Sequence, residues 1–289
     1  NNHLLASANP SFLGPPTVSA TLGITTAGAI TQSGVLNVAG ATTLAAGAAN
    51  NITLNNAANN FSSVGIVSGN NVALTDANAL DLGTFTISGT FTVAANGVVT
   101  QSGALNVTGA TTLAAGAANN IVLNNAANNF STVGITSGNN VTLRDANALI
   151  LGSSTISGAF DVTTSGALTQ SGPLNVAGTT TLAAGAVNNI VLTNAANSFS
   201  TVGITSGNNV ALTDSNALNL AASTVSGTFD VTTGGTLSQS GALMVTGTTT
   251  VTSTAANSDI LLGTQANNFG GAFSFAGTQA NFPHVSLRN

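Results

Sequence analysis

The chain has almost no charge and no cysteine. Its 289 residues include two arginines and no lysine, seven acidic residues that are all Asp, and no Cys, Trp or Tyr; 3% are charged, against about 25% in an average soluble domain. Without cysteine, neither a disulfide framework nor a thiolate metal site can form. The net charge is −5. With Arg144, Arg288, His3 and His284 as its possible cations, the chain offers no basic patch for nucleic acid or for an anionic membrane.

Long apolar runs are also missing. No stretch of about 18 apolar residues occurs, so the sequence predicts no membrane-inserted helix. The first residues, NNHLLASANPSFLGPP, have neither a basic start nor an apolar stretch, and they do not form a signal peptide. Few charges combined with many β-branched residues remove the usual protection against strand-to-strand association. The composition therefore favours a chain that associates with itself.

What the chain does have is a 69-residue repeat. TQSGVLN begins at Thr31 and returns as TQSGALN at Thr100, as TQSGPLN at Thr169 and as SQSGALM at Ser238, always at the same spacing. A fixed period of this kind predicts stacked units, each of which buries its apolar face only against its neighbours.

The repeat sets the expected domain boundaries. Residues 1–20 carry three of the five prolines and are expected to form a non-repeat arm, residues 21–276 the repeat array, and residues 277–289 a tail. Phe61, Phe130 and Phe199 keep the period, whereas Phe269 comes one residue late. If subunits pair end to end, the arm around Pro10 to Pro16 is expected to extend along the neighbouring subunit.

Short runs of alternating apolar and polar residues fill each repeat, separated by Gly, Asn, Ser and Asp. Alternation indicates strands, and the separating residues are typical of turns. Nine such runs predict an all-β, parallel β-solenoid with about three coils of three strands per repeat. In the third copy we expect the coils to begin at Phe160, Thr180 and Val210. The middle coil, 180–209, would then be the longest of the three and would hold the Ala- and Asn-rich excursions.

Clustered carboxylates would be needed by a solenoid enzyme that cleaves acidic polysaccharides. Asp76, Asp145 and Asp214 recur one per repeat, too far apart for an acid–base pair, and each is expected to be a turn residue that bonds its own backbone. Asp161 and Asp230 alternate with apolar residues and are expected on the solvated face. His3 and His284 lie at opposite ends of the sequence, so we predict no catalytic, cofactor-binding or metal-binding residues and no enzyme.

Three other recurring features have a structural and a functional interpretation. Thr pairs begin after Ala41, Ala110, Thr179 and Thr248, and regular Thr rows can order water at an ice-binding face, but we expect simple strand propensity. The recurring Phe side chains are expected to fill the solenoid interior rather than to bind a ligand at the surface. Asn139–Asn140 and Asn208–Asn209 are expected at turns, where Asn tolerates left-handed backbone and can stack on its copies.

The strings STVGITSGNNVTLRDANALILG and TQSGALNVTGATTLAAGAANNIVLNNAANNF resemble the repeats of secreted bacterial proteins of the filamentous haemagglutinin type, and they are similar to β-strand-repeat passengers of autotransporters. The resemblance covers about residues 21–276. It implies a right-handed parallel β-helix, export through an outer-membrane partner, and roles in adhesion, biofilm and surface fibres. The right hand also agrees with the general handedness of parallel crossovers.

We therefore expect a structural extracellular protein at the cell surface, a fibre or matrix filament whose subunits join head to tail. An alternative is an adhesin that binds glycans or host cells through its Asn-rich loops, Asn124–Asn129 and Asn194–Ser198. No cofactor, nucleic acid or membrane insertion is expected.

Overall fold

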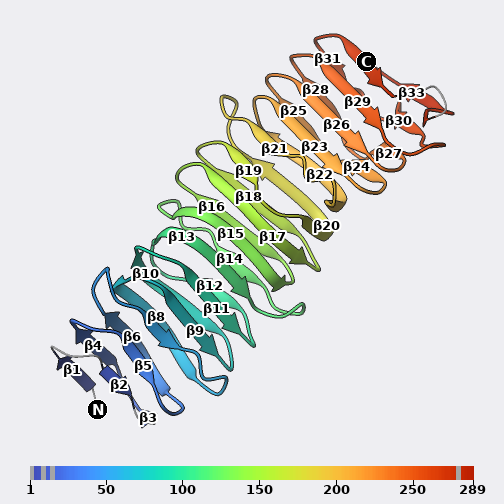
Figure 1. Cartoon of the computed structure of the whole chain (residues 1–289). Coiled ribbons are helices and arrows are strands. Elements are labelled where there is room, and N and C mark those ends of the chain that lie inside the picture. Colours follow the sequence, from blue (N-terminus) through green and yellow to red (C-terminus); the bar gives the residue numbers. More distant parts are fainter. Residues whose placement is uncertain (1–2, 8–10, 14–16, 278–280) are drawn as a thin grey trace. The chain divides into compact units, whose positions relative to one another are not determined.

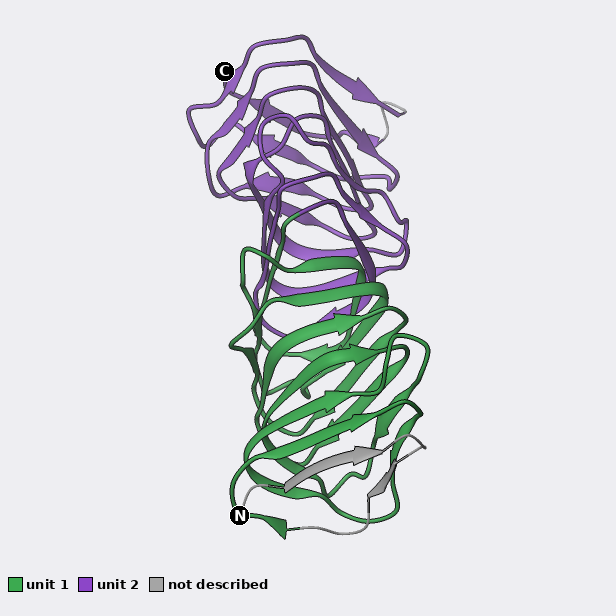
Figure 2. Ribbon diagram, turned by 90° about the vertical axis from the view of Figure 1, so that its left-hand side faces the viewer, with its two compact units in different colours: residues 1–146 green, residues 147–289 purple. Residues whose placement is uncertain are grey.

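Parallel β-strands make up each of two compact units, residues 1–146 and residues 147–289 (Figure 2). The computed structural model describes residues 3–7, 11–13, 17–277 and 281–289. It contains no α-helix in these residues, and the strands stack into β-solenoids with about 13 turns in all. The predicted all-β solenoid is confirmed.

The strands are short, and Figure 1 labels most of them in chain order. Unit 1 contains β1 (His3–Ser7), β2 (Ser11–Leu13), β3 (Thr17–Val18), β4 (Leu22–Thr26), β5 (Ile30–Gln32), β6 (Asn37–Ala45), β7 (Ile52–Leu54), β8 (Asn60–Gly69), β9 (Val72–Asp76), β10 (Leu80–Ile87), β11 (Phe91–Ala95), β12 (Val99–Gln101), β13 (Leu105–Ala114), β14 (Ile121–Leu123), β15 (Asn129–Gly138) and β16 (Val141–Asp145). Unit 2 contains β17 (Leu149–Ile156), β18 (Phe160–Thr164), β19 (Leu168–Gln170), β20 (Leu174–Ala183), β21 (Ile190–Leu192), β22 (Ser198–Ser206), β23 (Val210–Asp214), β24 (Leu218–Leu220), β25 (Ser223–Val225), β26 (Phe229–Thr233), β27 (Leu237–Gln239), β28 (Leu243–Val245), β29 (Thr249–Ser253), β30 (Ile260–Leu262), β31 (Asn268–Phe269), β32 (Phe273–Ala276) and β33 (Val285–Leu287).

Alternation of side chains decides which residues fill the interior. In β11, Phe91, Val93 and Ala95 are buried while Thr92 is exposed. Because each strand pairs in parallel with the strand one turn away, buried residues meet buried residues: Val72 registers with Phe91, and Phe91 with Thr111. The core of each unit therefore consists of rows of Val, Leu, Ile and Phe that buried Thr residues such as Thr111 interrupt.

The length of one turn follows from these registers. In unit 1, Leu22 registers with Thr42, Thr42 with Val64 and Val64 with Leu82, so successive turns are similar but unequal in length. A fourth step leads from Leu82 to Gln101. Phe91 is the copy of Leu22 in the next repeat, and it falls about midway along that fourth step. One repeat thus contains three turns and part of another, so equivalent residues of successive repeats in unit 1 lie on different sides of the coil.

This geometry corrects the expected division into coils. Phe160 does register with Thr180, but Thr180 registers with Val202 and not with Val210, so the predicted long coil 180–209 was wrong. The corner before β21 and the corner after it both lie within the single turn from Thr180 to Val202. We had assumed that the chain needs a long coil for its Ala- and Asn-rich segments, whereas these segments fold into compact corners.

Glycine makes one of these corners possible. Gly47 and Gly116 have φ values of 85° and 83°, in the left-handed region that side chains disfavour. Nearby, the Nδ2 of Asn50 donates to the carbonyl oxygen of Ala46 at 2.8 Å and closes the corner. Asn257 is the single non-glycine residue with positive φ in the described part of the chain. The left-handed backbone that Asn tolerates is therefore not used at Asn139–Asn140 or Asn208–Asn209.

The two terminal segments also join the ladders. In residues 1–20, expected as a non-repeat arm, β1 pairs with β4, β2 with β5 and β3 with β6. In residues 277–289, expected as a tail, β33 pairs with β30. Both segments therefore add strands to the solenoid. Pro10, Pro15 and Pro16, in the arm that we expected to extend along a neighbouring subunit, lie outside the described residues.

Candidate functional site

The glutamine of each TQSG or SQSG motif pairs with the amide of a buried asparagine. The Nε2 of Gln32, in the first TQSG motif, donates to the Oδ1 of Asn59 at 2.8 Å, and the Nδ2 of Asn59 donates back to the Oε1 of Gln32 at 2.9 Å. Asn59 is fully buried. The same pair recurs as Gln101–Asn128, Gln170–Asn197 and Gln239–Asn267. We call each of these pairs an amide clamp.

Each amide clamp also satisfies backbone groups around it. Asn59 accepts from the backbone N–H of Leu36 at 3.0 Å and donates to the carbonyl of Leu54 at 3.2 Å. Gln32 donates to the carbonyl of Gly34 at 2.6 Å. Buried polar groups are stable only when they are paired. This network pairs backbone N–H and carbonyl groups that lie beside the ends of neighbouring strands at one corner. Its role is to fix the corner between consecutive turns.

Sequence reasoning missed this clamp, although a signal was present. Gln32 and Asn59 lie 27 residues apart, and the same separation holds in the next two copies. A Gln and an Asn that keep a fixed separation in successive repeats, each next to apolar strand residues, indicate a hydrogen bond between the two side chains. The sequence analysis interpreted the Asn residues as turn formers and gave the Gln residues no structural role.

The recurring Asp side chains bind a neighbouring backbone segment. The Oδ2 of Asp76 accepts from the backbone N–H of Phe61 at 2.6 Å, and its Oδ1 accepts from the N–H of Asn78 at 2.7 Å. The bond to Asn78 confirms the predicted turn, and the buried Phe61 confirms the predicted interior role of Phe. Asp145 and Asp214 accept in the same way from Phe130 and Phe199.

These Asp residues are buried, which the sequence analysis did not anticipate. Burial raises the pKa of Asp76 and Asp214 above the ordinary value of 3.8, and the two backbone N–H bonds at each carboxylate oppose that rise. Asp161 and Asp230 are exposed, as predicted.

The Asn-rich loops that we considered for adhesion contribute to the clamps. Asn128 and Asn197 are fully buried, and the backbone N–H of Asn125 donates to the Oε1 of Gln101 at 3.2 Å. Exposed side chains of the Asn124–Asn129 segment include Asn124, Ala126 and Ala127. This loop therefore offers a small polar surface, and deleting it would remove a clamp together with that surface.

Paired Asn residues link adjacent turns. The backbone N–H of Asn140 donates to the Oδ1 of Asn120 at 3.1 Å, and that of Asn209 donates to the Oδ1 of Asn189 at 3.2 Å. The prediction that these Asn residues occur at turns is confirmed. Each of these bonds joins an Asn to another Asn 20 residues earlier in the chain.

The recurring Thr pairs divide between the two sides of the strand. Thr42, Thr111, Thr180 and Thr249 are buried, and their hydroxyl groups have no hydrogen-bond partner. The following Thr of each pair faces outward, as Thr43 and Thr112 do. Because each pair supplies one outward hydroxyl, the pairs do not form a two-dimensional Thr array of the kind expected of an ice-binding face.

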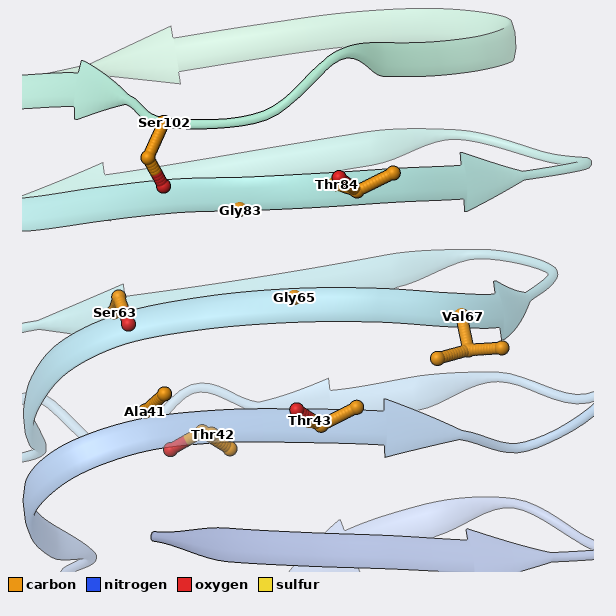
Figure 3. Close-up of a pocket in the computed structure, with 9 residues that line it drawn as sticks. All are labelled: Ala41, Thr42, Thr43, Ser63, Gly65, Val67, Gly83, Thr84 and Ser102. Carbon is orange, nitrogen blue, oxygen red and sulfur yellow. The ribbon is translucent and has the colours of Figure 1, made fainter.

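A shallow hollow of about 310 Å³ lies over β6, β8 and β10 in unit 1 (Figure 3). Gly65 and Gly83 form its floor, and Ser63, Thr84 and Ser102 place hydroxyl groups around it. None of the nine lining residues is titratable. The hollow can exchange hydrogen bonds with a neutral molecule, and it has no group for acid–base or nucleophilic chemistry.

No group of three or more His, Cys, Asp or Glu side chains that could hold a metal ion occurs in the described residues. Within the same residues there is no helix with the length and apolarity that crossing a membrane requires. His284 is exposed, and the side chain of His3 lies outside the description.

Comparison with known proteins gives one match. The family model described as repeats of unknown function (DUF5649) matches residues 1–68, 69–137, 138–206 and 207–276. The first match includes the segment 1–20, whose sequence NNHLLASANPSFLGPPTVSA parallels NNVALTDANALDLGTFTISG at residues 70–89. No curated protein and no solved structure matches the chain.

Proposed function

We propose that this chain, which belongs to the family of repeats of unknown function DUF5649, is a structural element: a subunit of an extracellular fibre or matrix filament whose β-solenoids join end to end. Its partner in that assembly is a further copy of itself, and its location is the cell surface or the extracellular space.

The observation that carries this proposal is the use of the recurring side chains. Gln, Asn, Asp and Phe of each repeat are engaged in holding one turn to the next, as at Gln101, Asn128 and Phe130. A repeat whose recurring polar side chains all bond to its own corners is suited to building a long, stiff solenoid. Such a use favours an architectural role over binding or catalysis.

Two further arguments support an extracellular role. The resemblance to haemagglutinin-type repeats implies secretion, adhesion and participation in biofilm. The low charge of the chain also leaves lateral surfaces made of Thr, Asn, Ser and Ala, which do not repel one another as charged surfaces would. We expect no catalytic activity.

The adhesin alternative has less support at the predicted loops. Two of the Asn residues in those loops, Asn128 and Asn197, are buried in amide clamps. A glycan array tests the alternative directly if it compares the unaltered chain with an Asn124→Ala variant, which changes an exposed side chain and preserves the clamp.

Electron microscopy and fibre diffraction of the purified chain test the structural proposal. We expect unbranched filaments, and a meridional reflection near about 4.8 Å from parallel strands stacked along the fibre. Dispersed monomers at every concentration reached would contradict end-to-end assembly.

A further inference from the structure

One corner of unit 1 differs in sequence from its counterparts in the other repeats. The corner between β11 and β12 has the sequence Ala95-Asn96-Gly97, whereas the first, third and fourth repeats have TAG, TSG and TGG, which begin at Thr26, Thr164 and Thr233. The second repeat therefore lacks the Thr and has an amide side chain in the position after it. This is also the one Asn-Gly pair in the sequence.

In the other three corners the Thr hydroxyl binds the glycine two residues later. The backbone N–H of Gly235 donates to the Oγ1 of Thr233 at 3.2 Å, and the first repeat has the same bond at 3.2 Å. Ala95 occupies this buried place in the second repeat and has no hydroxyl. The backbone N–H of Gly97 therefore lacks this acceptor, and within the described residues it has no other hydrogen-bond partner.

The side chain next to this unbonded N–H is also without a partner. Asn96 is exposed, and in the part of the chain that the structure describes its side-chain amide makes no hydrogen bond. Its own backbone N–H donates to the carbonyl of Asp76 at 3.1 Å, which holds the corner on the adjacent turn. An unbonded amide, an unbonded N–H after it and a glycine without a side chain to obstruct the approach together favour attack of the backbone nitrogen on the Asn side chain.

We propose that Asn96 is a site of spontaneous covalent modification, at which the backbone nitrogen of Gly97 converts the side-chain amide to aspartate or isoaspartate. The nitrogen of Gly97 gives its proton to hydroxide and bonds to the Cγ of Asn96, while the C–N bond of the amide breaks and ammonia leaves with a proton from water. A second water molecule then opens the cyclic imide. Attack at Cγ breaks the new C–N bond and gives aspartate, whereas attack at the backbone carbonyl carbon breaks the original peptide bond and gives isoaspartate. The net reaction consumes water, releases ammonia and changes no oxidation state.

The main chain at this corner has little room for an isoaspartate. A Cβ built on Gly97 would lie 2.5 Å from the backbone nitrogen of Ala79 and 2.7 Å from the carbonyl carbon of Asn78, in the adjacent corner between β9 and β10. Isoaspartate adds a methylene group to the main chain, and both products add a negative charge. Because the two corners are stacked this closely, we expect isomerisation to loosen their contact locally.

Prolonged incubation of the purified chain in mildly alkaline buffer is the first test. Peptide mapping should place the loss of an amide at Asn96, with both aspartate and isoaspartate present, and heavy-oxygen water should leave its label in both products. Asn257–Ser258 provides an internal comparison, because the backbone N–H of Ser258 donates to the carbonyl of Asn281 at 3.2 Å. Loss of the Asn257 amide as early as that of Asn96 would overturn the proposal.

A second test restores the hydroxyl that the other corners have. Ala95→Thr should slow the loss of the Asn96 amide about fivefold, the factor expected from one hydrogen bond of ordinary net strength to the attacking nitrogen. The variant should fold, since Thr fills the same buried place in the three other repeats. Ala94→Thr, one residue earlier, is the matched control and should leave the rate unchanged. If Ala95→Thr is modified as fast as the unaltered chain, the missing hydroxyl does not control the site and the proposal fails.

The structural consequence is tested with Asn96→Ser, which introduces the residue that the third repeat has at this place, Ser165. Incubation of the unaltered chain should speed amide hydrogen exchange at the β9–β10 and β11–β12 corners, and incubation of the variant should not. Neither measurement depends on whether the chain forms filaments, so the outcome is separate from that of the proposed function. An unaltered chain whose Asn96 stays intact as long as its other exposed Asn residues would contradict the proposal outright.

Discussion

Two segments of unit 2 occupy corresponding places in different turns and differ in what surrounds them. β23 has the sequence VALTD from Val210, and β33 has the sequence VSL from Val285 and is followed by Arg288 and Asn289. Phe229 registers with Val210, which is 1% exposed, whereas Val285 is 46% exposed. The apolar pattern is the same in both segments. What differs is whether another turn of the described residues covers the strand. Burial of an inward side chain in this fold therefore depends on the neighbouring turns and not on the sequence of the strand alone.

The corner beside each segment is nevertheless the same. The backbone N–H of Phe199 donates to the Oδ2 of Asp214 at 2.6 Å, and that of Phe269 donates to the Oδ1 of Asn289 at 2.7 Å. The chain separation is 15 residues in the first case and 20 in the second. In the second corner a longer connection breaks the period of the repeat, and a side-chain amide replaces the carboxylate. The backbone N–H of Phe nevertheless has a side-chain acceptor in both corners.

Removing one amide clamp should have the largest effect and should differ between the two corners. Asn197→Ala removes the side-chain partner of the N–H of Leu174 and of the carbonyl of Leu192, and it leaves the Gln170 amide with only its bonds to Gly172 and Asn194. We expect a loss of about 2–4 kcal/mol in the free energy of unfolding, measured by urea denaturation. Asn267→Ala removes the equivalent clamp next to the last turn, and we expect mainly local fraying there, seen as faster amide hydrogen exchange.

The control for this prediction is Asn175→Ala, at an exposed position of β20. Its effect should stay within about 0.5 kcal/mol. Equal losses from Asn197→Ala and Asn175→Ala would mean that the clamp contributes nothing to the stability of the corner.

The carboxylate and amide corners should also respond differently to pH. Burial raises the pKa of Asp214 in the folded chain above the 3.8 expected when unfolded. The folded state therefore holds its proton more tightly, so this group favours folding below pH 3.8, and the contribution is lost as pH rises through the raised pKa. Asp76 has the same sign. We expect the urea midpoint to be higher at pH 3 than at pH 7, opposite to the usual acid sensitivity of proteins.

Asp214→Asn sharpens the comparison, because it converts the Asp214 corner to the chemistry of the Asn289 corner. The variant should reduce the change in midpoint between pH 3 and pH 7, while the outward Asp230→Asn should leave that change as it is. A solenoid that unfolds on acidification would contradict the assignment of carboxylates whose pKa is raised by burial.

The comparison shows which features a sequence period can predict. Alternation within Phe160-Asp161-Val162 predicts the strand and its inward face, and the repeat predicts stacking, because both are local consequences of a side-chain period of two. The period could not reveal the length of a turn, since one repeat does not divide into whole turns in unit 1. It also could not identify the clamp, because Gln170 and Asn197 meet only after the chain has passed once around the coil. The strand in the tail was missed because the longer connection displaced it.

The smallest effect on the free energy of unfolding is expected from replacing a buried Thr hydroxyl group, and this replacement should increase stability. Thr180 lies between Phe160 and Val202 in the interior row of unit 2, and its hydroxyl has no partner, in contrast to the amide of Asn197. Thr180→Val replaces that hydroxyl with a methyl group of nearly the same shape. It should raise the free energy of unfolding by about 1 kcal/mol, since an unpaired buried hydroxyl loses its hydrogen bonds to water on folding and gains none in the folded chain.

Thr181→Val, at the adjacent outward-facing position, is the control for this gain and should change the urea midpoint little. The denaturant slope should be unchanged in both variants, because neither alters the surface exposed on unfolding. A loss of stability in Thr180→Val would show that the hydroxyl is bonded after all, for example to a buried water. In that case the interior of the solenoid would hold a second set of polar contacts besides the clamps. A gain would instead mean that the corners alone supply the directional bonds, while the interior rows contribute only by packing.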